Sequence, residues 1–157
     1  MTPSDLQPLL PELCLHAQRT WPAECCGLLL EDARGSLRFE PIENVAGSKL
    51  AQVNSQRSQR DGYVMDPKAL LAALAQVEAS GGRLSGIVHS HPEVGAYFSR
   101  EDREMALGGG DEPLWPGVQY LVISVRQGKA DEARLYSWEA DNSEFREEQL
   151  AGIAAIS

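Results

Sequence analysis

GIVHSHP, residues 86–92, places two histidines behind a run of small and β-branched residues, and SRED follows at residues 99–102. Such a run is typical of the end of a buried strand. Residues two apart on a strand point to the same side, about 6.6 Å apart along the chain, so His89 and His91 can both reach one metal ion. Asp102 follows at the start of an expected helix. Two histidines and one aspartate leave the fourth position of a tetrahedral zinc for water, as in catalytic sites.

The same residues also allow less specific interpretations. Ser99-x-x-Asp102 is a common helix start, in which the serine caps the helix and the acid lies near the positive end of its dipole. Taken alone, this pattern favours capping, and a single histidine on an apolar strand is more often a core residue than a ligand. Two of the three histidines, however, stand as His-x-His ahead of an acid, and this concentration favours a metal site. Composition alone does not separate a hydrolase from a protein with structural zinc.

The layout of these residues resembles that of the JAMM, or MPN-plus, zinc metallopeptidases. The signature of that family is an upstream Glu, then His-x-His-Pro, then Ser-x-x-Asp after this same interval. The upstream acid matches Glu24 in PAECCGLLL, residues 22–30, and YVMDP at residues 63–67 resembles the family's approach to its second helix. The resemblance extends to about residue 138, and the short chain is similar to the bacterial stand-alone branch. Phe98 stands where many members have Pro, which affects the stiffness of a loop and no ligand.

The resemblance implies the fold. It predicts an MPN-like α+β domain with a mixed, mostly antiparallel sheet flanked by helices, in a cytidine-deaminase-like layout. A length of 157 residues fits one domain with one core, so we expect residues 1–157 to form a single domain.

The resemblance also implies a role for each site residue. His89, His91 and Asp102 would hold one Zn²⁺ per chain, which lowers the pKa of its bound water nucleophile to about 7. Glu24 would act as the general base that takes the water proton and returns it to the leaving amine. Ser99 would donate a hydrogen bond to the oxyanion. From the sequence alone Glu24 is better explained as a paired or capping acid, and the family match is what raises the catalytic role above that alternative.

The residues themselves support amide hydrolysis, and the resemblance supplies the substrate. Family members cleave peptide or isopeptide bonds after the tail of ubiquitin-like proteins. The small bacterial forms act on ubiquitin-fold sulfur carriers that end in Gly-Gly, in one setting releasing cysteine built on the carrier. We therefore expect a metallopeptidase whose partner is such a carrier, with the tail bound by strand addition at a sheet edge. The alternatives are a catalytically silent MPN scaffold, which usually lacks the His-x-His and Asp set, and a structural zinc protein.

Composition and charge argue against other classes of partner. The net charge of −9 is the opposite of what a nucleic-acid-binding surface needs. No apolar run approaches the length of a membrane span, and the N-terminus lacks a basic region followed by a hydrophobic one. We therefore expect neither nucleic acid nor membrane as a partner and a cytoplasmic location, while the oligomeric state stays open.

The three cysteines are expected to be reduced. Cys25 and Cys26 are neighbours, which is poor geometry for pairing, and one of them should face the core and the other the opposite side of a strand. The absence of Cys-x-x-Cys and Pro-Cys-x-x-Cys leaves a thiolate zinc site and the zinc deaminase signature unsupported. Ser90, between the two histidines, is expected to point away from the metal and to pack or to support the ligands.

Periodicity and turn signals predict the remaining elements. We expect helices over residues 8–20, from 67 to about 80 and from 99, and strands over 27–31 and 36–44 (a hairpin), 84–91, 119–125 and 133–138. The second helix should bury a stripe formed by Leu70, Leu71, Leu74 and Val77.

Three segments keep open interpretations. Residues 45–61 are expected to form a mobile surface loop, whose Arg57 and Arg60 are more readily explained as solvated charges than as a grip on a carboxylate terminus. Trp115 is interpreted as a core anchor in preference to part of a substrate groove. The acidic tail from residue 139 is either a last strand or a helix, and the histidine strand should end at a sheet edge or sheet end.

Overall fold

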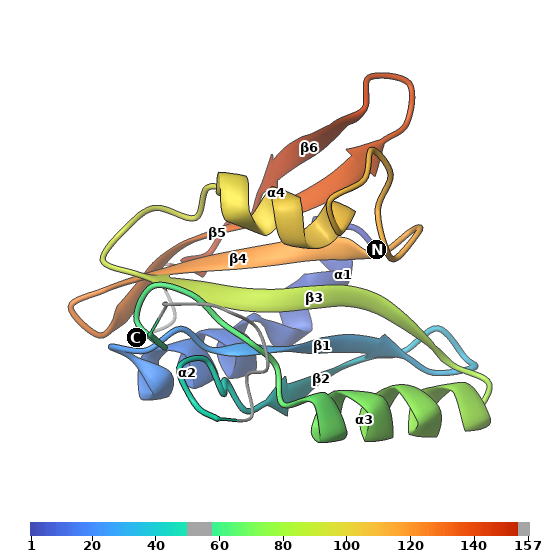
Figure 1. Cartoon of the computed structure of the whole chain (residues 1–157), viewed down its shortest axis with the longest axis horizontal. Helices are drawn as coiled ribbons and strands as arrows, with labels where there is room; N and C mark the ends of the chain where they lie inside the picture. The colour runs from blue at the N-terminus through green and yellow to red at the C-terminus, as the bar shows by residue number, and fades with distance from the viewer. Residues whose placement is uncertain (50–57, 154–157) are drawn as a thin grey trace.

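Six strands form the sheet that carries the two histidines (Figure 1). The computed structural model describes residues 1–49 and 58–153. The strands lie in the spatial order second, first, third, fourth, fifth, sixth, and only the third and fourth are parallel neighbours. In chain order they are β1 (Cys26–Glu31), β2 (Leu37–Ile42), β3 (Arg83–Pro92), β4 (Gln119–Arg126), β5 (Lys129–Glu139) and β6 (Glu144–Gln149). The mixed, mostly antiparallel sheet of the predicted α+β fold is confirmed.

The helices follow the predicted order, with one addition at the N-terminus. In the described residues they are α1 (Pro3–Leu6), a 3₁₀ turn (Gln7–Leu9), α2 (Leu10–Thr20), α3 (Pro67–Ala79) and α4 (Arg100–Leu107). The predicted helix over residues 8–20 begins at Leu10, with Pro11 in its first turn, where a proline removes no helical hydrogen bond. The short α1 was not predicted, and a capping box between Thr2 and Asp5 starts it.

The connections explain the strand directions. The turn between β4 and β5 has positive φ angles at both central residues, Gln127 (50°) and Gly128 (76°), as a two-residue hairpin turn of type I′ requires. The hairpin of β1 and β2 is antiparallel, as predicted. Between β3 and β4 the chain instead crosses over through α4, which is the kind of connection that parallel neighbours need. The open alternative for the tail is settled by β6, which pairs with β5.

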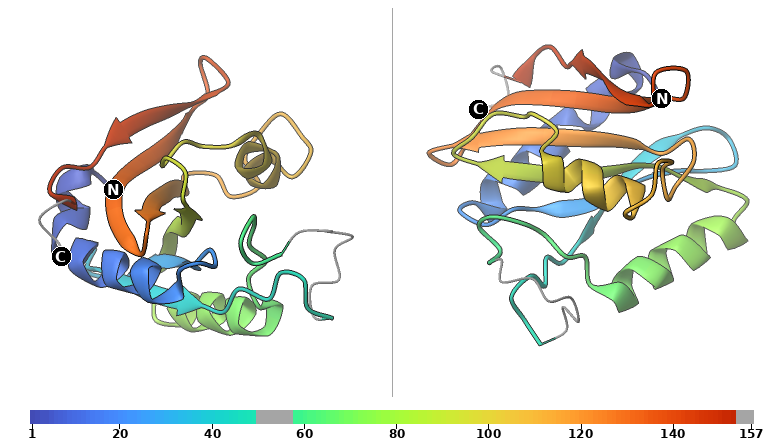
Figure 2. Two further views of the ribbon diagram at one scale, coloured as in Figure 1. Left: turned by 90° about the vertical axis from the view of Figure 1, so that its left-hand side faces the viewer. Right: turned by 45° about the horizontal axis from the view of Figure 1, so that its top comes forward.

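One face of the sheet, called the closed face below, packs against α1 and α2. Both helices lie behind the sheet in Figure 1 and on the same side in Figure 2. The main apolar core forms there because every strand from β1 to β5 presents aliphatic or aromatic side chains to these helices. Its leucine, isoleucine, valine and phenylalanine members are Leu6, Leu10, Leu13, Leu29, Phe39, Val88, Leu121, Ile123, Val125, Leu135, Leu150 and Ile153.

The other face, called the open face, is covered by two separate helices (Figure 2). Over β1 and β2, Ala73 and Val77 of α3 pack on Leu28 and Leu30. Over β4 and β5, Ala106 of α4 belongs to a second cluster. The C-terminal half of β3 lies between these two clusters.

The predicted buried stripe of α3 was wrong at one position. Leu71 is 67% exposed, whereas Ala73 is buried and Leu70 and Leu74 are partly buried. The stripe therefore follows positions 70, 73, 74 and 77, and a residue directly after Leu70 is turned about 100° away from it toward solvent.

Two predictions meet the limits of the described chain. Part of the predicted loop over residues 45–61 lies outside the described residues, and Arg57 belongs to that part. Among the described residues, every helix is too short or too polar to span a bilayer.

Candidate metal centre

The two histidines lie at the carboxyl end of β3, on the open face. This strand is interior, because β1 pairs with it on one side and β4 on the other, and His89 lies opposite Cys26 and Val122. The prediction of a sheet edge is therefore wrong, and that of a sheet end is right. Residues on β3 alternate between the faces, so His89 and His91 share the open face while Ser90 points to the closed one. Both imidazoles are buried, His89 completely.

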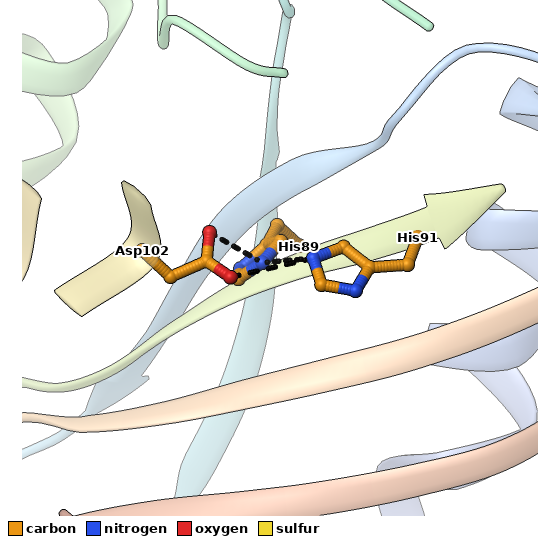
Figure 3. Close-up of side chains that lie close together, drawn as sticks. All are labelled: His89, His91 and Asp102. Atoms are coloured by element: carbon orange, nitrogen blue, oxygen red, sulfur yellow. Dashed lines mark hydrogen bonds and ion pairs between the residues drawn. The ribbon is translucent and has the colours of Figure 1, made fainter. Parts of the chain in front are cut away.

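Three ligand atoms converge at this point (Figure 3). The Nε2 atoms of His89 and His91 are 3.1 Å apart, and they lie 3.1 Å and 3.4 Å from the carboxylate oxygens Oδ1 and Oδ2 of Asp102. Ligands about 2.0–2.1 Å from a tetrahedral zinc are separated by about 3.3–3.4 Å. The three side chains are therefore close enough together to share one small ion of that geometry.

Asp102 is held in place by the start of α4. Its Oδ2 accepts a hydrogen bond from the backbone N–H of Ser99 (2.8 Å), and its own N–H donates to Ser99 Oγ (3.1 Å). This is a capping box, so the capping interpretation is correct. It does not compete with the ligand interpretation, because Oδ1 still faces His89. The same two residues start the helix and aim its carboxylate at the histidines.

The tautomer of His91 follows from its second nitrogen. Nδ1 lies 3.0 Å from the carbonyl oxygen of Gly95, which can only accept a hydrogen bond, so Nδ1 carries the proton. Nε2, the nitrogen left to bind an ion, lies toward Asp102 and His89. A metal-binding histidine needs this state, and such outer partners tune the affinity of metal sites.

Burial and charge act against each other in the cluster. Burial is the largest influence on Asp102 and would raise its pKa, but hydrogen bonds from His89, His91 and Ser99 outweigh it and hold the pKa well below its usual range. Burial lowers the pKa of His89. It also opposes charge on His91, yet Asp102, the Gly95 carbonyl and the negative charge of Glu24 together raise that pKa. The centre thus combines an ionised carboxylate with buried imidazoles, a donor set suited to a divalent cation.

Glu24 comes from the segment just before β1. Its side chain is 7% exposed and lines the same cleft as His91 and Asp102, although it is not among the three converging ligand groups. Its backbone is held on both sides, since the N–H donates to the carbonyl of Gln59 (2.6 Å) and the C=O accepts from Asn44 Nδ2 (3.0 Å). Glu24 therefore shares the cleft with the ligands without being one of the three converging groups.

Asn44 organises this wall of the cleft and was missed by the sequence reasoning. Its buried Nδ2 donates to the carbonyls of Glu24 (3.0 Å) and Gly62 (3.1 Å). Its Oδ1 accepts from the backbone N–H groups of Ala46 (3.0 Å) and Val64 (3.1 Å). No local motif indicates this arrangement, because three of the four partners lie about 20 residues away in the sequence.

Tyr63 and Ser90 support the histidine strand. Tyr63 stacks on His89 with the ring centroids 4.8 Å apart. Ser90 Oγ accepts the backbone N–H of Cys25 (2.8 Å), which ties the strand end to the residue after Glu24. Cys25 joins the core of the closed face, whereas Cys26, opposite His89, lies on the open face, as predicted for such a pair. All three cysteines are free thiols.

A cleft of about 1150 Å³ opens over the centre. Its wall includes the half-exposed side chains of Tyr97 and Met105, together with Arg60. Trp115 also lines this cleft and is 39% exposed, so its interpretation as a core anchor was wrong.

The comparison with protein families agrees with this geometry. The model of prokaryotic homologs of the JAB domain matches residues 6–141, which is most of the chain and includes every residue of the centre. The chain belongs to the prokaryotic JAB family. It is a JAMM-type metallopeptidase, as the resemblance implied, with a candidate metal site at His89, His91 and Asp102.

Two relatives of this JAB-family chain carry a functional name. The chain is 33% identical over 132 residues to a desampylase of Haloferax volcanii, covering 83% of this chain and 78% of that protein. It is 37% identical over 94 residues to a probable TtuB-protein conjugate cleaving protease of Thermus thermophilus, covering 60% and 56% of the two chains.

Solved structures share the JAB-family fold. A solution structure from Desulfitobacterium hafniense aligns with a TM-score of 0.64 at 26% identity, and one from Salinibacter ruber aligns with 0.59 at 27%. Each alignment covers 90% of this chain and 86% of the other.

Proposed function

We propose that this chain hydrolyses a peptide or isopeptide bond after the C-terminal Gly-Gly of a ubiquitin-like sulfur-carrier protein, using one zinc ion. The observation that carries the proposal is the convergence of two imidazole nitrogens and one carboxylate in a cleft that Glu24 also lines. The substrate class is supported by the relatives, one named as a desampylase and the other for cleaving conjugates of TtuB with proteins.

His89, His91 and Asp102 are the proposed zinc ligands. Their spacing and their N, N, O donor set support zinc, and three protein ligands are typical of catalytic sites. When bound, the ion would supply the Lewis acidity that brings the pKa of a water molecule to about 7. The chain contributes the fixed geometry, because the histidines stand on an interior strand and the aspartate stands in a capping box.

Glu24 and Ser99 are the proposed catalytic side chains. Glu24 takes a proton from the attacking water and passes it to the leaving amine, a role supported by its place beside the ligands. The hydroxyl of Ser99 accepts one hydrogen bond from Asp102 N and still has its own proton to donate. With this proton it donates a hydrogen bond to the carbonyl oxygen of the scissile bond while negative charge develops on that oxygen. Hydrogen-bond donors of this kind stabilise the transition state by about 3–4 kcal/mol.

Strand addition to β3 is not open to the tail of the substrate. Because β3 is paired with β1 and with β4, an extended tail cannot add to the strand that carries the histidines. The route proposed for the tail near the ligands is the cleft that residues of α3 and α4 line. Tyr97 lines the cleft with its ring 5.2 Å from that of His91, and a bulky side chain of this kind beside the ligands supports a preference for glycine in the substrate.

The setting is also proposed. Residues 1–157 act as one catalytic domain, and three free thiols support a reducing compartment such as the cytoplasm.

A cleavage assay with a matched variant tests the function. A panel of ubiquitin-fold sulfur carriers, each with a reporter peptide fused after its C-terminal Gly-Gly, is incubated with the zinc-loaded protein. We expect cleavage directly after Gly-Gly that a zinc chelator abolishes. Glu24→Gln should lower kcat by at least about 100-fold, the lower range for loss of a general base, with its zinc content unchanged.

Glu148→Gln is the control, because Glu148 lies on β6 and forms an ion pair with Arg146 on the same strand. It should cleave like the wild type. A folded, zinc-loaded wild type that leaves every carrier intact would overturn the proposal and favour a silent scaffold. Glu24→Gln at wild-type rate would remove Glu24 from the mechanism.

A further inference from the structure

The segment between β3 and α4 is fastened to the sheet by side chains of β4 and β5. Its Val94 carbonyl accepts from Ser124 Oγ (2.7 Å). The Ala96 N–H donates to Glu132 Oε2 (3.0 Å), and the Ala96 carbonyl accepts from the hydroxyl of Tyr136 (2.7 Å). The carbonyl that receives the His91 proton belongs to the residue between these two fastened positions.

The groups that hold Ala96 belong to a polar network on β5 and β6. We call Glu132, Arg134, Tyr136 and Glu147 the brace. Arg134 forms ion pairs with Glu132 on its own strand and with both carboxylate oxygens of Glu147 (2.9 and 3.0 Å) on the next strand. Glu147 also lies 3.0 Å from the Tyr136 hydroxyl. The Ala96 N–H and then Arg134 hold the pKa of Glu132 below its usual range, so Glu132 is ionised at neutral pH.

The same hairpin of β5 and β6 contacts the helix that carries Asp102. Arg103 donates to the carbonyl of Ser143 (3.0 Å), and its guanidinium lies 5.6 Å and 5.7 Å from the ring centroids of Trp138 and Phe145. Phe145 also contacts Phe98, just before the cap of α4, with the ring centroids 4.8 Å apart. The residues of β6 lie beyond the stretch 6–141 that the family model matches.

We propose that the brace positions His91 for metal binding, so that β5 and β6 set the metal affinity from outside the cleft. The path is short: Tyr136 and Glu132 fix Ala96, Ala96 fixes the Gly95 carbonyl, and that carbonyl fixes the proton on His91 Nδ1. Without the brace, the carbonyl moves and Nε2 of His91 is no longer held at the position that it shares with His89 and Asp102. This inference rests on the proposed zinc centre and is independent of the substrate.

Tyr136→Phe is the most direct test, because it removes only a hydroxyl and leaves the ring in its cluster. Zinc affinity is measured by competition with a chromogenic chelator, and the unfolding temperature of the metal-free protein is measured in parallel. We expect Tyr136→Phe to weaken zinc binding by about 10–100-fold, the range for loss of an outer partner of a metal ligand.

Tyr120→Phe is the matched control. Tyr120 lies directly opposite Tyr136 on β4 in the same cluster, and its buried hydroxyl has no hydrogen-bond partner in the described part of the chain. It should bind zinc as the wild type does. Glu147→Gln, at a half-exposed side chain, is a milder second variant, and its neighbour Glu148→Gln is the control for it. We expect a several-fold loss of affinity in Glu147→Gln and none in Glu148→Gln.

The readouts separate a positioning role from a structural one. A merely structural role would lower the unfolding temperature of the metal-free protein and leave the zinc affinity of the folded protein unchanged. That result in Tyr136→Phe and Glu147→Gln would overturn the proposal, whether or not the protein cleaves carriers. A wild type that binds zinc but cleaves no carrier would overturn the proposed function without affecting the proposed role of the brace.

Discussion

The two faces of the sheet differ in what covers them. On the closed face α1 and α2 lie over the sheet, and the side chains between them are almost all apolar. On the open face α3 and α4 stand apart, and β3 presents His89 and His91 in the space between their two clusters. Side chains at the end of β3 thus point alternately toward the closed face and toward the metal centre on the open face.

The difference shows where polar residues can be buried. Most buried polar side chains of the described chain lie near the gap on the open face, including Glu24, Asn44, His89, His91 and Asp102, whereas Ser90 points to the closed face. Burying a polar group is unfavourable unless it is hydrogen-bonded, and Asn44, His91 and Asp102 each form a hydrogen bond with nearby backbone. The apolar core of the closed face stabilises the fold, and this stability offsets the free-energy cost of burying polar side chains on the open face.

The largest expected effect on stability lies on the closed face. Leu13→Ala removes a side chain that is 1% exposed and should lower the free energy of unfolding by about 2–5 kcal/mol. Urea denaturation of the metal-free protein measures this loss. The zinc affinity of the folded fraction should not change, because α2 contacts no ligand.

Leu15→Ala is the control on the same helix, since Leu15 is 42% exposed. It should change the free energy of unfolding by no more than about 0.5 kcal/mol. Equal losses in the two variants would contradict the division between the faces.

A smaller loss of stability with a larger loss of activity is expected at Asn44. Asn44→Ala leaves buried backbone groups unpaired and should lower the free energy of unfolding by about 1–3 kcal/mol. Because the Glu24 carbonyl loses its hydrogen bond from Asn44, kcat should fall while zinc stays bound. Urea denaturation, the kcat of carrier cleavage and the zinc content of the variant test these expectations. Asn44→Asp keeps the two hydrogen bonds that Oδ1 accepts and loses the two that Nδ2 donates, including the one to Glu24. A fall in kcat in Asn44→Ala but not in Asn44→Asp would therefore contradict the role of the contact with Glu24.

The smallest effect on stability is expected at Ser99, where cap and catalysis overlap. Ser99→Ala should lower the free energy of unfolding by about 1 kcal/mol through loss of the cap. Ser99→Gly should lower it by only a few tenths, because glycine is tolerated at this position. If the hydroxyl acts on the substrate, both variants should lose kcat to a similar degree. A glycine variant with full activity would reduce Ser99 to a cap.

The sequence predicted those parts of the site that are local in the chain. His89 and His91 stand two residues apart on one strand, and Ser99 and Asp102 start one helix, so their geometry follows from strand and helix periods. The family resemblance added Glu24, whose role no local pattern indicates.

What the sequence could not predict depends on distant partners. Asn44, Tyr63 and the brace act through residues from about 10 to more than 35 positions away. The order of strands was equally hidden, because it depends on how α4 carries the chain across to β4. The error at Leu71 has a local cause: four leucines and valines fit a helical stripe in more than one way, and only packing on β1 decides between them.

Asp102 belongs to the capping box and to the metal centre at once. Winding of the first turn of α4 and loading of the ion are therefore thermodynamically linked: each makes the other more favourable by the same amount. A chain that meets scarce metal would thus hold a looser helix along one wall of its cleft, and the supply of the ion would regulate the shape offered to a substrate.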